Sequence, residues 1–186
     1  MTRRSRRSSR PSTRARAPSL CSAVGYRIQR HGLEAERIDH GYDYLVTDVT
    51  VREEDPEDLS ACFEVNEYKV EVKATTKGEA CLTPLQAMTC ATEEETFVLC
   101  VVDLRDFDGD IHQVDWETAE VSDHCKLISG EELPIDKTLA LVRSAEGGDV
   151  PIRNAGALRY AVPPELWESG LDVDEWVEEA FSRQSA

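Results

Sequence analysis

Glu71-Val72-Lys73 places an acid and a lysine two residues apart near the end of a strand-like run, Tyr68 to Ala74. Side chains at positions i and i+2 of a strand point to the same face, roughly 6.6 Å apart along the strand. A second strand-like run, Tyr44 to Val51, begins directly after Asp43. The sequence therefore predicts that the acid–lysine pair and Asp43 can be directed together at one small target.

Two carboxylates and a lysine are suited to hold Mg²⁺ against a phosphodiester and to orient an attacking water. The spacing alone is weakly specific, because Glu67-Tyr68-Lys69 repeats it on the same strand face. The alternative is a solvated strand face on which acids and lysines form cross-strand pairs. If the site is catalytic, we expect Lys73 to be a strand-end lysine that faces a polar cleft and contributes little packing. The alternative for this lysine is a buried structural ion pair with Glu71.

The order of the expected elements favours the site over the solvated face. We expect a helix over about residues 20–30 and strands over about 33–38, 42–51, 62–74 and 96–104. The last of these strands is almost wholly apolar, which is typical of a strand covered on both faces. A helix between the last two strands begins at Thr83-Pro84-Leu85-Gln86, where Thr is the N-cap and Gln at N3 completes a capping box. Gln86 can therefore face the site or serve only the cap, and the sequence leaves both open.

Asp108-Gly109 predicts a hairpin turn that leads into Ile111–Trp116. Beyond Trp116 the pattern is weaker: Thr138–Arg143 predicts a strand, and Ala157–Val162 predicts another. The C-terminal end predicts a helix that opens with Asp172 and Glu175 as a cap-like pair. Its apolar residues recur at helical spacing and predict one core-facing side, made of Val173, Trp176, Val177, Ala180 and Phe181.

Four stretches together resemble the PD-(D/E)xK nuclease superfamily, and more narrowly the C-terminal domain of NO VEIN-type proteins found in restriction and defence proteins. They are Gly41-Tyr42-Asp43-Tyr44-Leu45, Val70-Glu71-Val72-Lys73-Ala74-Thr75, Leu82-Thr83-Pro84-Leu85-Gln86 and Phe97-Val98-Leu99-Cys100-Val101-Val102-Asp103. The late Leu158–Pro163 with Trp167 is also similar. The resemblance covers roughly residues 23–167.

This resemblance implies an α/β (α+β) fold with a restriction-endonuclease-like core: a mixed central sheet flanked by helices, followed by a C-terminal β/α extension. It implies that Asp43 and Glu71 bind Mg²⁺ or Mn²⁺, with the Val72 carbonyl as a possible third ligand. Lys73 would position the attacking water, and Gln86 would face the site. The implied partner is nucleic acid, with DNA expected before RNA. The alternative is a non-catalytic module of the same fold that binds nucleic acid or a partner protein of a defence system.

Length and composition favour one domain, over residues 19–186, in a soluble protein without a membrane span. The chain has 186 residues, 40% of them hydrophobic, so a sizeable core is available. Its six cysteines contain no C-x-x-C pair and no metal-finger spacing. We expect reduced thiols and a cytoplasmic location.

Charge is divided unevenly along the chain. Residues 1–17 hold seven arginines and no acid, whereas the rest holds all 37 acids against 14 of the 21 basic residues, a balance of −23. Such an acidic body is typical of proteins that work in concentrated salt, where screening removes self-repulsion. We expect residues 1–18 to form a disordered tail. A phosphate-binding tail, a transit peptide and a misplaced start or separated gene fragment all remain open for it.

Overall fold

Five strands form one mixed sheet in the computed structural model, which describes residues 19–38, 40–51, 63–109, 121–146 and 158–182. They are β1 (Glu34–Arg37), β2 (Tyr44–Val51), β3 (Phe63–Thr75), β5 (Phe97–Asp103) and β6 (Cys125–Ser129), in the spatial order β1-β2-β3-β5-β6. The β3–β5 pair is parallel and the other three pairs are antiparallel. The chain is thus a mixed α/β protein with helices on both sides of the sheet, as the sequence predicts.

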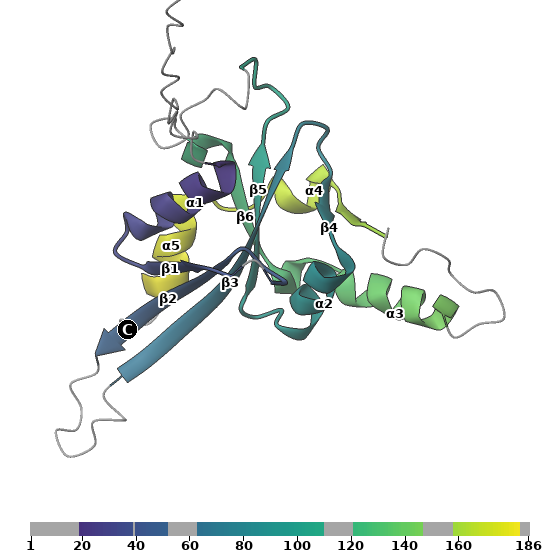
Figure 1. The fold of residues 1–186 in the computed structure, drawn as a ribbon, viewed down its shortest axis with the longest axis horizontal. Helices are drawn as coiled ribbons and strands as arrows, with labels where there is room; N and C mark the ends of the chain where they lie inside the picture. The colour runs from purple at the N-terminus through teal and green to yellow at the C-terminus, as the bar shows by residue number, and fades with distance from the viewer. Residues whose placement is uncertain (1–18, 39, 52–62, 110–120, 147–157, 183–186) are drawn as a thin grey trace, which may run out of the picture.

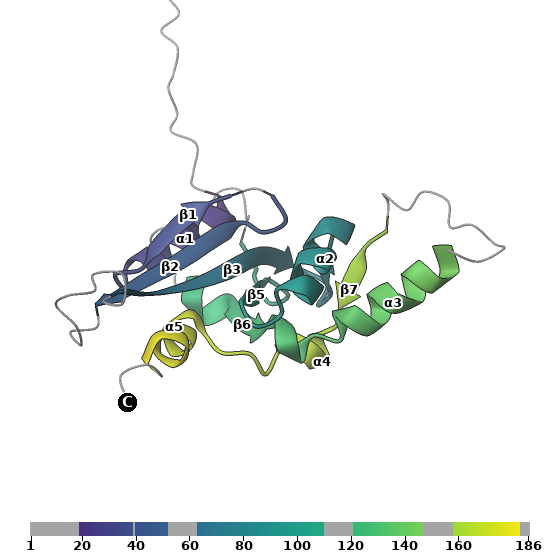
Figure 2. The same cartoon turned by 90° about the horizontal axis from the view of Figure 1, so that it is seen from below.

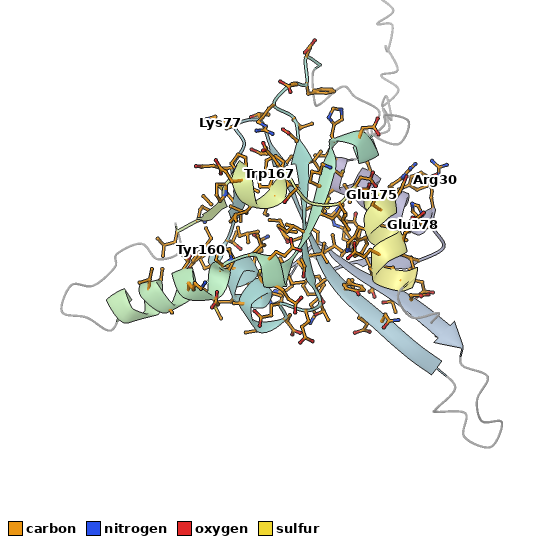
Figure 3. The ribbon with its side chains drawn as sticks, turned by 180° about the vertical axis from the view of Figure 1, so that it is seen from behind. Arg30, Lys77, Tyr160, Trp167, Glu175 and Glu178 are labelled. Atoms are coloured by element: carbon orange, nitrogen blue, oxygen red, sulfur yellow. The ribbon has the colours of Figure 1, made fainter. Side chains whose placement is uncertain are left out.

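The helices form one layer on each side of this sheet (Figure 1). One layer contains α1 (Leu20–Gln29) and α5 (Val173–Ser182). The other contains α2 (Pro84–Thr92), α3 (Ile135–Glu146) and α4 (Pro164–Trp167), with the small sheet of β4 (Ala80–Leu82) and β7 (Tyr160–Val162). Figure 3 shows Glu175 and Glu178 of α5 on the same side as Arg30, and Trp167 and Tyr160 on the opposite side.

β5 lies in the middle of the core, as its apolar sequence predicts. Its residues from Phe97 to Val102 are all buried. Val98, Cys100 and Val102 face the core beneath α1 and α5, and the residues between them face the core beneath α2 and α3. A strand covered on both faces needs no polar alternation, which is why it reads as one continuous apolar run.

α5 confirms the predicted C-terminal helix and its cap. The Asp172 N–H donates to Glu175 Oε2 at 3.1 Å, and the Glu175 N–H donates to Asp172 Oδ1 at 2.8 Å. The two side chains thereby satisfy N–H groups that the first helical turn leaves unpaired. Trp176 meets Tyr68 of β3 edge-to-face, with ring centroids 5.5 Å apart. The predicted apolar side of this helix therefore packs on the sheet.

The prediction of a strand over Thr138–Arg143 is wrong, because these residues belong to α3. Ile135 and Leu139 are buried in the core beneath α2, one helical turn apart, and Val142 packs against the same core. This i, i+4, i+7 contact pattern outweighs the strand preference of the local sequence. The last turns of α3 leave the body of the molecule (Figure 2).

Two further strands, β4 and β6, were not expected from the sequence. β4 has three residues, too few for a local signal, and pairs with β7, with Ala80 opposite Val162. β7 lies within the strand predicted over Ala157–Val162. The predicted N-terminal tail and the hairpin that should follow Gly109 lie outside the described residues. None of the helices within the described ranges is long and apolar enough to cross a bilayer.

Candidate functional site

The second half of β3 has one apolar and one polar face. Val70 is fully buried beneath α1 and α5, whereas Glu71 and Thr75 lie on the opposite face. These two are the buried polar residues within the described ranges, with 1% and 5% of their surface exposed. Since a carboxylate is rarely buried without partners, the surroundings of Glu71 need a chemical explanation.

Asp43 lies beside the end of β3 that carries Glu71. The β2–β3 register ends at the Tyr44–Val70 pair, and Asp43 directly precedes β2. The Asp43 N–H donates to the Val70 carbonyl at 3.0 Å, one residue out of that register. The charge of Asp43 contributes to the raised pKa of Glu71. Asp43 is therefore near Glu71 without being its partner in the ladder.

The Asp43 carboxylate also holds the end of the ladder. Its Oδ2 accepts a hydrogen bond from the Val72 N–H at 2.8 Å. The N–H and the carbonyl of one strand residue point towards the same neighbouring strand. The Val72 carbonyl is therefore directed, like the Val72 N–H, to the side of β3 on which Asp43 lies.

The turn before Asp43 is pressed against α2. Gly41 has φ +82°, in the left-handed region that favours glycine. A Cβ atom added there would lie 2.8 Å from Thr89 Oγ1 of α2. The glycine therefore suits both the positive φ of the turn and its close contact with Thr89 of α2.

Two donors converge on a single oxygen of Glu71. Gln86 Nε2 donates to Glu71 Oε1 at 2.5 Å, and Lys73 Nζ forms an ion pair with the same oxygen. Burial raises the pKa of Glu71 from an ordinary 4.5 to about 7; Lys73 and Gln86 oppose this rise and the charge of Asp43 adds to it. Glu71 therefore changes its protonation near neutral pH, as a functional carboxylate often does.

Gln86 serves both the cap and the site, so the two roles left open by the sequence coexist. Its Oε1 accepts from the Thr83 N–H at 2.8 Å, and its own N–H donates to Thr83 Oγ1 at 3.3 Å. These bonds complete the predicted capping box of α2 and leave the amide nitrogen to reach Glu71. The start of α2 is thereby tied to the carboxylate on β3.

Lys73, predicted to be a strand-end lysine with little packing of its own, forms an ion pair with Glu71. It pairs with a carboxylate that is 1% exposed, and 22% of its own side chain is exposed. Lys69, four residues earlier on the same face, pairs with Glu93 at 2.8 Å, and that carboxylate is 44% exposed. The Glu71-x-Lys73 spacing thus forms a pair with a buried carboxylate, whereas the lysine of the Glu67-x-Lys69 repeat pairs instead with an exposed carboxylate of another element.

Beyond Lys73 the chain leaves the site through a firmly held turn. Thr75 Oγ1 accepts from the N–H groups of Lys77 and Gly78, at 3.2 and 2.9 Å. Trp167 Nε1 donates to the Gly78 carbonyl at 2.9 Å. Sequence reasoning missed the role of Thr75. The available signal was a threonine at the end of a strand, directly before a short polar turn from whose N–H groups its hydroxyl can accept hydrogen bonds.

No protein-family model matches this chain, and no curated protein matches its sequence. The site must therefore be judged by its own chemistry.

The donor atoms at the site are hard oxygens. Asp43 and Glu71 supply carboxylates and Val72 supplies a carbonyl, the kinds of ligand that Mg²⁺ prefers. Both bonds to Glu71 use Oε1, and the bond from Val72 uses Oδ2 of Asp43. Among the described residues, no group of three or more His, Cys, Asp or Glu side chains is arranged to hold a metal ion. A two-carboxylate site still suits Mg²⁺, which usually keeps several waters and binds one or two carboxylates plus substrate phosphates.

Proposed function

We propose that this chain is a Mg²⁺-dependent nuclease domain of the PD-(D/E)xK type that hydrolyses phosphodiester bonds of nucleic acid, DNA first among them, in a restriction or defence context. One observation carries the proposal: the buried Glu71 receives Lys73 and Gln86 on one oxygen, and Asp43 is hydrogen-bonded to the β3 residues on either side of it. The order α1-β1-β2-β3, then α2 and β5, supports a restriction-endonuclease-like core.

In this proposal Asp43 and Glu71 hold the ion, and the Val72 carbonyl is a third ligand. Such an ion polarises the scissile phosphate and stabilises the charge that develops on it. Glu71 must be ionised to act as a ligand. Lys73 and Gln86, which both donate to its Oε1, favour that ionised form and fix the direction of the carboxylate.

Lys73 also has the geometry to hold the attacking water. An ammonium group has three N–H donors, and one contact is made to Glu71. The side chain is 22% exposed, so it reaches solvent on one side. A water held there would meet a phosphate beside the two carboxylates. Lys73 would then act mainly in the transition state, by positioning the water and stabilising charge.

A non-catalytic module of the same fold is the second candidate. Each site residue also has a structural partner: Asp43 holds the Val72 N–H, Gln86 caps α2, and Glu71 pairs with Lys73. The acidic balance of −23 outside residues 1–17 also repels nucleic acid at low salt. A module would keep these bonds and bind a partner without cleaving it.

Calorimetric titration with Mg²⁺ and Mn²⁺ at pH 8, combined with cleavage assays on DNA and RNA, tests the proposal. Wild type should bind one ion and cleave, and Glu71→Gln should do neither. Glu67→Gln changes an exposed acid on the same strand face and should do both. Binding of nucleic acid without cleavage would identify the module, and absence of metal binding by wild type would refute the proposed site.

A further inference from the structure

A groove on the far side of the sheet from Glu71 is lined by aromatic and acidic residues. Its volume is about 410 Å³, and it lies between α5, β6 and the middle of β3. Tyr68 and Trp176 are among its lining residues and are in edge-to-face contact with each other. Its lining also includes four exposed glutamates: Glu95, Glu131, Glu132 and Glu179. No lysine or arginine is present among the described residues that line it.

The chemistry of this groove matches arginine. A guanidinium group stacks on Tyr and Trp faces and donates to carboxylates in a planar fork. A single bound metal ion is a poorer match, because no three acidic side chains of the described part are arranged to hold one. Four separate glutamates line the groove, so they suit one extended ligand that carries several cationic groups.

The chain itself contains such a ligand. Residues 1–17 hold seven arginines and no acid. This tract ends two residues before α1, which begins at Leu20. An extended chain of that length spans up to roughly 60 Å, enough to reach any face of a domain of this size. We propose that the groove is the docking site of the arginine-rich tract, residues 1–17, of the same chain.

Trypsin digestion of the full chain at low salt tests this proposal, since six of the seven arginines of the tract are cleavage sites and only Arg10 is followed by proline. The triple variant Glu131→Gln/Glu132→Gln/Glu179→Gln should speed cleavage within residues 1–17 about tenfold. The matched control, Glu34→Gln/Glu36→Gln/Glu79→Gln, removes the same charge; all three residues are exposed, and two lie on β1 at the other sheet edge. Its cleavage rate should stay that of wild type.

Equal rates of tryptic cleavage within residues 1–17 in the two triple variants would overturn the proposal. Any protection of the tract would then be explained by its general attraction to an acidic domain. Protection that grows with protein concentration would also contradict it, by placing the tract in the groove of a second copy. Hydrogen exchange gives an independent readout. Replacing all seven arginines of the tract by glutamine should raise exchange in residues 127–132 and 173–181, and unchanged exchange there would refute docking.

Discussion

Gln86 joins the first turn of α2 to the buried carboxylate of Glu71, donating to it at 2.5 Å while its other side-chain atom caps the helix. A helix start and a strand residue are thus coupled through one amide group. Any shift of α2 would change the hydrogen bonding of Glu71, and loss of the Glu71 charge would weaken the bond that holds α2.

Glu71→Gln should change how stability depends on pH. Because burial raises the pKa of Glu71 in the folded state above its ordinary value of 4.5, to about 7, the folded state binds more protons than the unfolded state between these values. Wild-type stability should therefore fall as pH rises from 4.5 to 7, by roughly 3 kcal/mol at most from this group. Urea unfolding across that range without metal should show a flatter profile for Glu71→Gln, whereas Glu67→Gln should keep the wild-type profile.

Lys73→Ala should destabilise the fold above pH 7, because it leaves a buried carboxylate without its cation. Breaking a buried pair costs up to about 3–5 kcal/mol, and the cost should shrink below pH 7, where Glu71 takes up a proton. Lys69→Ala is the matched control: its partner Glu93 is 44% exposed, and such a surface pair contributes about 0–1 kcal/mol. Similar losses for the two variants at pH 8 would show that the Lys73 pair is not special.

Gln86→Glu should separate the cap from the site. Glutamate at N3 still completes a capping box, but a second carboxylate beside Glu71 should raise its pKa further and weaken Mg²⁺ binding. Thr83→Ala does the converse, because it removes the cap hydroxyl, at about 0.5–2 kcal/mol, and leaves the contact with Glu71. Metal titration should therefore show the larger change for Gln86→Glu, and thermal unfolding should show the larger change for Thr83→Ala. Equal metal affinities would exclude Gln86 from the site.

Asp43→Asn should preserve the fold and lose the metal. An asparagine oxygen can still accept from the Val72 N–H, which Asp43 holds at 2.8 Å. Because the charge of Asp43 contributes to the raised pKa of Glu71, that pKa should fall in the variant. Asp43→Ala should also cost about 1–3 kcal/mol, since it leaves a backbone donor unpaired. Metal binding by Asp43→Asn equal to that of wild type would remove Asp43 from the ligand set.

Salt should raise nuclease activity rather than lower it. Ordinary DNA binders lose affinity with salt through counterion release. Here the balance of −23 outside residues 1–17 should repel DNA until it is screened, and the Debye length falls to about 3 Å at 1 M salt. We expect cleavage to increase from about 0.1 M towards molar KCl, with circular dichroism as the control for folding. Decreasing activity with intact folding would contradict a salt-adapted nuclease.

Signals that depend on neighbouring residues were readable in the sequence. The capping box of α2, the apolar run of β5 and the cap pair of α5 each involve atoms within one or two turns, or one strand, so local physics decides them. The same-face spacing of Glu71 and Lys73 also follows from strand geometry alone. The sequence by itself therefore determined the order of the main elements through β5 and the shared face of Glu71 and Lys73.

Only the tertiary structure decided the features that depend on distant contacts. Thr138–Arg143 became helical because Ile135 and Leu139 are buried against α2 and the sheet, and β4 exists because it pairs with β7, almost eighty residues later. The burial of Glu71, its two donors on one oxygen and the bond from Val72 to Asp43 require α2, β2 and β3 to meet. The spacing of residues in the sequence predicts which side chains can be neighbours. The burial of Glu71, and hence its raised pKa, depends on how the helices pack on the sheet.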